Sequence, residues 1–369
     1  LEKKFFITEE QAVTPAEILM GAFTDADKIY INGICCGSSY DRYAPRIYPV
    51  APGILRAGEN VVCIHLYVFR GRGGAMPGKQ YGIRFKKGKE RWLDLSGTWD
   101  AQIRKQMEYL PEKTFFNYMA SAMFNGMISP VSPYKICAVI YYQGESDVGH
   151  PNRYALEFRA LVNDWRKSWK EKQLPIIYVQ LAGFSDGNIK KQGTQWAEFR
   201  EVQRQAMEIE NTAMIQAYDV GEYNDLHPMD KKTLGMRAAL AVHKLVYGEK
   251  EECTGPQVRK IRLDRDKRVH AVFDQPLQTG SKKDGCELVS EVELRKANGD
   301  YKRAYVTVDG NEICAWLSDG EEPTGIRYAW KDCPMNICLY GKKGLPVIPF
   351  IKEWGRDAIY TGKICETYR

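Results

Sequence analysis

The most constraining feature of this sequence is an alternation, over residues 136–247, of apolar runs with stretches of helical periodicity. Three runs stand out, namely residues 136–142 (Ile-Cys-Ala-Val-Ile-Tyr-Tyr), 175–182 (Pro-Ile-Ile-Tyr-Val-Gln-Leu-Ala) and 213–218 (Ala-Met-Ile-Gln-Ala-Tyr). The continuous apolar character of the first run is typical of a strand covered on both faces. The sequence therefore predicts three buried strands in this stretch.

The segments that separate and follow these runs have the spacing of amphipathic helices. In residues 154–172, the apolar positions that share one helix face are Phe158, Leu161, Val162, Trp165 and Trp169. A second helix is predicted around residues 196–207 and a third over residues 233–247. Strands that alternate with helices indicate βαβ units, an α/β fold class and a parallel sheet whose chemistry lies at the carboxyl ends of its strands.

The sequence on either side of this stretch has the pattern of short β-strands. Residues 28–33 end in Asn-Gly, a strong hairpin signal. Beyond residue 251, alternating stretches such as residues 303–308 are closed by Asp-Gly, and no long helical pattern occurs. We predict three domains: a jelly-roll β module over residues 1–95, the α/β core over 96–250 and a β-sandwich-like domain over 251–369.

Composition excludes several classes of function. A net charge of +6 over 369 residues, with basic and acidic residues interleaved, gives little support to a nucleic-acid or membrane-surface partner. No apolar run approaches the roughly 18 residues of a membrane span. The ten cysteines form no paired C-x-x-C array, and the five histidines lack the spacing of metal ligands, so we predict no metal site. The sequence contains no phosphate-binding loop, so we predict no cofactor. Disulfides in the C-terminal third are left undecided.

The first candidate site segment directly follows the first predicted strand. Gln143 offers an amide donor, Gly144 allows close approach of the backbone, and Glu145 places a carboxylate at the end of an apolar strand. An alternative interpretation is a polar turn in which Ser146 or Asp147 caps the next helix. The residue types alone leave both interpretations open.

The second candidate segment lies in the loop that follows the third predicted strand. His227 is the one histidine of the five that has a nearby carboxylate, that of Asp225, in a loop facing the presumed site. A carboxylate that fixes the tautomer of an imidazole leaves the other ring nitrogen free to accept a proton from a nucleophile. The alternative is that the His-Pro pair simply forms a turn.

With these segments in order, the chain resembles the sialate O-acetylesterase family of SGNH-type hydrolases. The resemblance rests on several blocks that occur in the order of that family. These blocks are residues 21–33 with 46–50 and 57–61, residues 124–130 (Phe-Asn-Gly-Met-Ile-Ser-Pro), residues 140–147 (Ile-Tyr-Tyr-Gln-Gly-Glu-Ser-Asp), residues 225–228 (Asp-Leu-His-Pro) with Lys231 and Gly235, and residues 327–330 and 344–350.

The resemblance implies a fold and a reaction. The fold is the second half of an SGNH-hydrolase, flavodoxin-like core, flanked by a galactose-binding-like jelly roll and a C-terminal β-sandwich. The reaction is removal of O-acetyl groups from sugars by a serine esterase. Carried onto this sequence, His227 is the general base, Asp225 orients it, Gln143 points an amide at the oxyanion or the acetyl ester, and Glu145 braces the site. Because the SGNH group more often has a longer spacing between acid and histidine, Asp219 is an alternative orienting acid.

One expected block is not found in the sequence. The family places its serine nucleophile in a Gly-Gln-Ser-Asn block ahead of the jelly roll, and neither this block nor the Gly-Gly-Thr block after it is present. Ser38 and Ser39 lie in the β module and Ser146 in a turn, so they are poor substitutes. Three explanations are a truncated chain, a separate segment or subunit that carries the nucleophile, and a degenerate pseudoenzyme. We favour the separate segment.

Two alternative functions follow from the same residues. One is a non-catalytic carbohydrate-binding protein, because the β modules are rich in aromatic residues and the nucleophile is missing. The other is an acetylxylan esterase-like polysaccharide deacetylase, which shares the chemistry and differs in the sugar. The family resemblance favours a secreted, periplasmic or lysosomal location, although residues 1–6 carry no signal-peptide pattern.

Overall fold

The structure is a computed structural model that describes residues 1–69, 71–88, 91–108, 114–185, 192–280, 289 and 291–354. The chain divides into two compact units, Leu1–Phe116 and Asn117–Arg369. Within the described residues, no helix is both long enough and apolar enough to cross a membrane.

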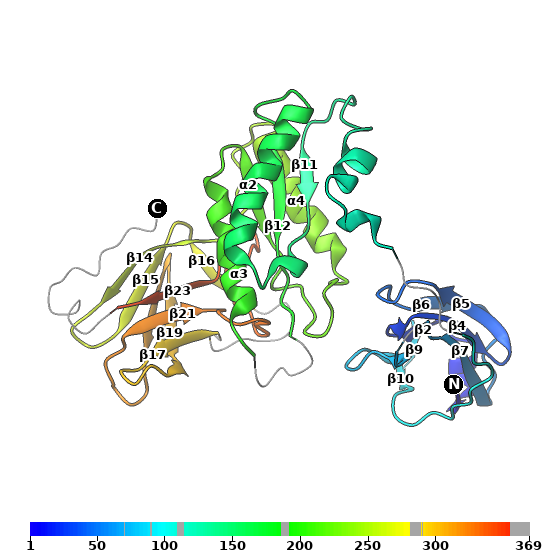
Figure 1. Ribbon diagram of the computed structural model, residues 1–369. Coiled ribbons are helices and arrows are strands. Elements are labelled where there is room, and N and C mark those ends of the chain that lie inside the picture. Colours follow the sequence, from blue (N-terminus) through cyan, green and yellow to red (C-terminus); the bar gives the residue numbers. More distant parts are fainter. Residues whose placement is uncertain are drawn as a thin grey trace. The chain divides into compact units, whose positions relative to one another are not determined.

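The first unit is built from two four-stranded antiparallel sheets (Figure 1). One sheet has the order β1 (Glu2–Ile7), β7 (Gly58–Tyr67), β4 (Ala26–Ile31) and β5 (Ile34–Ser39). The other has the order β10 (Trp92–Asp94), β9 (Tyr81–Phe85), β2 (Ala16–Met20) and β6 (Ile47–Val50). A two-stranded pair, β3 (Phe23–Thr24) with β8 (Gly74–Ala75), and the short helix α1 (Glu9–Ala12) complete the unit. Alternate residues of both sheets meet in one hydrophobic core, which is why the strands of this unit show period-two patterning.

The second unit contains the predicted parallel sheet. Its order is β11 (Val139–Tyr141), β12 (Ile176–Gln180) and β13 (Thr212–Gln216), and both pairings are parallel. The α/β class and the parallel sheet expected from the sequence are therefore confirmed. Because the crossovers between parallel strands run over the faces of the sheet, helices cover it on both sides.

Three helices form the layers above and below this sheet (Figure 1). Helices α2 (Pro151–Ser168) and α3 (Gln195–Gln205) share one hydrophobic cluster with Ile176 and Tyr178 of β12. Helix α4 (Lys231–Leu245) shares another cluster with Ile177 and Val179, the residues that point to the opposite face. This double coverage explains the continuous apolar run in the sequence of β12.

Strand β11 differs from its prediction. The sequence predicts a strand covered on both faces over residues 136–142, whereas β11 has only three residues and the side chain of Ile140 is 58% exposed. The physical reason is its position. Among the described residues β11 pairs with β12 alone, so it is an edge strand whose other side carries no neighbour.

From Val258 onwards, the described part of the second unit consists of antiparallel β-structure. One sheet has the order β14 (Val258–Leu263), β15 (Val269–Phe273), β20 (Glu312–Trp316) and β19 (Tyr305–Asp309). Another has the order β18 (Tyr301–Arg303), β17 (Val292–Arg295), β21 (Gly325–Tyr328) and β23 (Phe350–Glu353), and β16 (Leu277–Thr279) pairs with β22 (Leu339–Gly341). Buried residues of these sheets form one shared hydrophobic cluster. Cys338 in this region is disulfide-bonded, which answers the question that the sequence left open.

Candidate active site

The predicted site residues lie at the carboxyl edge of the parallel sheet. Tyr141 of β11, Tyr178 of β12 and Met214 of β13 are in register, so the chain leaves all three strands at the same edge. The Gln143 segment follows β11, and the His227 loop follows β13. Because β12 lies between these two strands, the strand ends are about 10 Å apart. A substrate that fits across the end of β12 would therefore touch both segments.

The side chain of Gln143 is held in one orientation from both sides. Its Oε1 accepts a hydrogen bond from the Tyr141 hydroxyl at 2.8 Å, and its Nε2 donates to Oδ2 of Asp147 at 2.8 Å. Burial raises the pKa of Tyr141 well above its usual range, so this phenol stays a neutral donor. An amide nitrogen has two N–H groups. Gln143 thus keeps a second N–H for a ligand once the first is bound to Asp147.

The turn after Gln143 depends on glycine. Gly144 has φ +150°, and a Cβ at this position would lie 2.8 Å from Cε1 of Phe199 on α3. Helix α3 also provides Gln203, which is buried and accepts a hydrogen bond from the backbone N–H of Leu181 at 2.9 Å. The turn that carries Gln143 and Glu145 therefore rests directly on α3, and α3 in turn is bonded to the end of β12.

Glu145 and Asp147 bound a short 3-10 helix, η3 (Glu145–Asp147). Ser146 between them is exposed, and neither Ser146 nor Asp147 caps α2, which begins at Pro151 after His150. The alternative interpretation of this segment as a helix cap is therefore wrong. Asp147 instead accepts from Gln143, and Glu145 lies half-buried at the carboxyl edge of the sheet.

His227 and Asp225 face one another in the loop after β13. Oδ1 of Asp225 accepts a hydrogen bond from the backbone N–H of His227 at 2.8 Å and lies 3.7 Å from its Nδ1. The Asp225 side chain is 10% exposed, whereas that of His227 is 52% exposed. A separation of 3.7 Å is longer than a hydrogen bond, but acid–base pairs of this kind commonly tighten when a ligand binds. The imidazole is accessible, and a buried carboxylate lies beside its Nδ1.

The His227 loop is tied to the end of β12. The backbone N–H of Ser185, which follows β12, donates to the carbonyl of Tyr223 at 2.6 Å. Gly221 and Gly183 approach so closely that a Cβ on Gly221 would lie 2.7 Å from the Gly183 carbonyl oxygen. The loop is thus held against the middle strand by main-chain contacts, which place His227 at the sheet edge.

Asp219, the alternative orienting acid, has a different partner. Its two carboxylate oxygens accept from both terminal nitrogens of Arg237 on α4, at 2.6 and 2.7 Å. The side chains of Asp219 and Arg237 are 1% and 4% exposed, and Arg237 also donates to the Gln216 carbonyl at 2.6 Å. This bidentate pair anchors α4 to the end of β13, a structural role for Asp219.

Sequence reasoning missed a segment of the C-terminal β-structure that reaches this edge. Oδ1 of Asp332 accepts from the backbone N–H of Trp196 at 2.9 Å and so caps the start of α3. The buried Arg200 donates to the carbonyls of Lys331 and Asp332, and burial lowers its pKa to about 10. Cys333 lies against Gly183. No local pattern could have found these contacts, because their partners are more than 130 residues apart in the sequence.

An apolar groove with a volume of about 500 Å³ lies between α4 and the open side of the sheet. It is lined chiefly by Ile140, Tyr142, Val179, Ile215, Leu234 and Val242. The Lys231 ammonium lies 5.2 Å from the centroid of the Tyr142 ring. Burial raises the pKa of Tyr142 well above its usual range.

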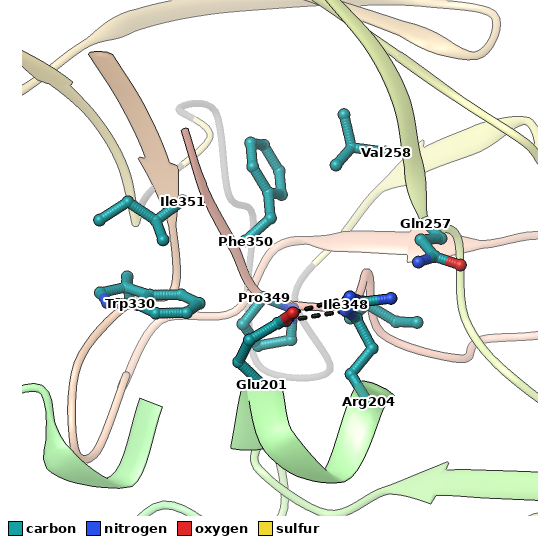
Figure 2. Close-up of a pocket in the computed structure, with 9 residues that line it drawn as sticks. All are labelled: Glu201, Arg204, Gln257, Val258, Trp330, Ile348, Pro349, Phe350 and Ile351. Carbon is teal, nitrogen blue, oxygen red and sulfur yellow. Dashed lines mark hydrogen bonds and ion pairs between the residues drawn. The ribbon is translucent and has the colours of Figure 1, made fainter. Parts of the chain in front are cut away.

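A smaller cavity of about 100 Å³ lies between α3 and the C-terminal β-structure (Figure 2). Glu201 and Arg204 of α3 form a bidentate ion pair over it, at 2.7 and 2.8 Å, and Trp330 and Phe350 line its apolar side. The residues that line this cavity include no histidine and no hydroxyl or thiol nucleophile. We therefore interpret it as a packing defect of the interface rather than a reaction site. In the described part of the chain, no group of three or more His, Cys, Asp or Glu side chains is arranged to hold a metal ion.

Comparison with known proteins shows which family part of the chain resembles. Residues 101–244 match the family model described as carbohydrate esterase, sialic acid-specific acetylesterase. The human sialate O-acetylesterase is 28% identical over 264 residues, and the mouse protein is 30% identical over 275 residues. Over residues 101–244 the chain is similar to the sialate O-acetylesterase family.

The sialate O-acetylesterase match covers every candidate site residue, because Gln143, Glu145, Asp219, Asp225 and His227 all lie between residues 101 and 244. Among solved structures, a carbohydrate acetylesterase from Xanthomonas citri is 29% identical with a TM-score of 0.56, and the match covers 63% of this chain and 53% of that chain. The human and mouse matches cover 63% of this chain and 48% and 47% of those proteins. The chain thus spans about half the length of the curated relatives it matches.

Proposed function

We propose that this chain carries the acid–base half of a carbohydrate O-acetylesterase, with His227 as the general base and Asp225 as the residue that orients it. The single observation that supports this proposal most directly is the His227 loop. An accessible imidazole with a largely buried carboxylate beside its Nδ1 is held at the carboxyl edge of a parallel sheet. This edge is the usual location of catalytic residues in open α/β folds.

The reaction is acyl transfer in two steps. Nε2 of His227 accepts the proton of a serine hydroxyl while the serine oxygen attacks the acetyl carbonyl carbon of an O-acetylated sugar. As the tetrahedral intermediate collapses, the same proton passes to the departing sugar oxygen. Water, activated by His227, then attacks the acetyl-serine and releases acetate. The carboxylate of Asp225 stabilises the imidazolium that forms in each step.

The second N–H of Gln143 is suited to the developing negative charge on the acetyl oxygen. Its orientation is fixed in advance by Tyr141 and Asp147, and preorganised donors are the most effective kind of oxyanion stabilisation. We assign Glu145 a bracing role, because it begins the short helix of the turn that presents Gln143.

We place the serine on a separate segment that completes the sheet beside β11. In the described part of the chain, the edge of β11 that has no strand partner, the exposed Ile140 and the apolar groove over α4 form one apolar surface. The preceding segment adds exposed apolar side chains, namely Tyr118, Met119, Met123, Phe124, Met127, Val131, Tyr134 and Ile136. Apolar surface of this extent is normally buried against a partner. Each Å² of apolar surface removed from water is worth about 25 cal/mol of hydrophobic free energy. A strand added next to β11 would end at the same edge as Gln143.

The test is ester hydrolysis by the chain combined with a polypeptide that carries the serine block. The substrates are 4-nitrophenyl acetate, an O-acetylated sialic acid and acetylated xylan, which separate the general reaction from the choice of sugar. With His227→Ala, kcat should fall by roughly 10²–10⁴-fold because the proton transfer is lost. The matched control is His65→Ala, an exposed histidine of the first unit. Equal turnover by His227→Ala and wild type would exclude His227 from the mechanism.

A further inference from the structure

The sheet of order β14–β15–β20–β19 has one face that is not buried in the core. Ile261, Val269, Ala271, Ile313 and Ala315 point inward and belong to the hydrophobic cluster. The residues that alternate with them point outward. Strand pairing places the outward side chains in rows that cross the sheet, since His270 is opposite both Arg262 and Cys314, and Trp316 is opposite Tyr305.

The row at the end of the sheet carries two aromatic rings and a guanidinium. The rings of Tyr305 and Trp316 are 6.0 Å apart between centroids and only 18° from parallel. Cζ of Arg268 lies 5.2 Å from the centroid of the Trp316 ring. We call Arg268, Trp316 and Tyr305 the Trp316 surface.

Part of this arrangement serves the sheet itself, because aromatic cross-strand pairs stabilise antiparallel strands. Two features go further. Tyr305 is 49% exposed, so much of the aromatic area still faces solvent. Arg268 is exposed and forms no ion pair with any residue in the described ranges. A cation held on an indole ring without a carboxylate partner is available for an anionic ligand.

The next row provides fixed polar groups. Arg262 donates to Oε1 of Glu312 at 2.9 Å, and Nε2 of His270 lies 2.9 Å from Oδ2 of Asp264. These contacts hold the polar side chains in place beside the aromatic pair. The strand and turn that border the surface are strongly basic, because residues 259–268 contain six Lys or Arg and two Asp. The surroundings therefore favour a ligand with negative charge.

We infer that the Trp316 surface binds a carbohydrate that carries a carboxylate, of the sialic acid class. The aliphatic face of a sugar ring stacks on flat aromatic side chains, and the Arg268 guanidinium matches a carboxylate in a two-bond geometry. The choice of an acidic sugar rests on the proposed function, but the binding itself needs neither His227 nor a serine nucleophile. The surface would hold a glycan chain while acetyl groups elsewhere on it are removed.

The experiment is glycan binding to the full chain, measured by saturation-transfer NMR and by titration calorimetry, with 3′-sialyllactose as ligand and lactose as its neutral counterpart. Wild type should bind sialyllactose more tightly than lactose. Trp316→Ala and the milder Tyr305→Ala should each weaken sialyllactose binding by about tenfold or more. Arg268→Gln should abolish the preference for sialyllactose over lactose, whereas Arg159→Gln on α2 and Tyr40→Ala in the first unit, both at exposed positions, should leave binding unchanged.

The result separates this inference from the esterase proposal, because the binding measurement uses the chain without a serine segment. Absence of sialyllactose binding by wild type would overturn the inference and leave the role of His227 untouched. Unchanged binding by Tyr305→Ala, whose circular dichroism matches wild type, would overturn it as well. Equal affinity of wild type for sialyllactose and lactose would overturn the proposed recognition of an acidic sugar by Arg268.

Discussion

At the scale of single residues, Asp219 and Asp225 have different partners, and these partners indicate which of the two can orient His227. Asp219 is buried and spends both oxygens on Arg237, whereas Asp225 lies beside Nδ1 of an accessible imidazole. A buried carboxylate that is paired in this way stays with its partner, because breaking the ion pair would leave an unpaired charge buried away from water. The geometry thus favours Asp225 as the residue that positions His227.

Arg237→Ala should therefore destabilise the second unit by about 3–5 kcal/mol, the usual effect of removing one partner of a buried ion pair. Arg259→Ala is the matched control, because Arg259 forms an exposed pair with Asp274 that is worth about 0–1 kcal/mol. Urea unfolding followed by circular dichroism measures both variants. Equal loss of stability in the two variants would contradict a structural role for the Asp219–Arg237 pair.

At the scale of elements, the turn between β11 and η3 depends on the helix beneath it. Gly144 combines a φ of +150° with close approach to the Phe199 ring. Because α3 leaves no room for a side chain here, the turn that presents Gln143 needs a glycine at this position. The position of the candidate oxyanion donor is thus decided by packing on α3 as much as by its own strand.

Gly144→Ala should destabilise the second unit by more than about 2 kcal/mol, because it adds both backbone strain and a clash with an aromatic ring. Gly149→Ala in the same connection meets no atom within 4 Å and should change the stability by less than about 0.5 kcal/mol. Thermal unfolding distinguishes the two. A Gly144→Ala protein as stable as wild type would show that the turn adapts, contrary to this account.

At the scale of the whole chain, the exposed edge of the parallel sheet is the feature that most favours association with other polypeptides. Among the described strands only β12 pairs with β11, so the other side of β11 is exposed beside an apolar groove, and such edges recruit other strands. We expect the chain by itself to associate at micromolar concentration and to bind the apolar dye ANS.

Ile140→Lys should reduce this association, because a lysine on an edge strand discourages further pairing. Leu156→Lys, which changes an exposed leucine on the outer side of α2, is the control and should leave association unchanged. Sedimentation velocity reports the outcome. A wild-type chain that sediments as a 42.2 kDa monomer without binding ANS would contradict the idea that this edge is completed by another segment.

The sequence by itself determined the elements whose signals are local. The periodicity around Phe158 and Trp165, the apolar run of β12 and the order of the family blocks predicted a parallel sheet, its helices and the two segments at its carboxyl edge. Tertiary structure alone decided what depends on distant partners. The pairing of Asp219 with Arg237 and the cap that Asp332 places on α3 join residues 18 and 136 positions apart. The exposure of Ile140 depends on β11 having one partner among the described strands. Local patterns report how a segment can fold, whereas burial and pairing depend on which surfaces the whole chain brings together.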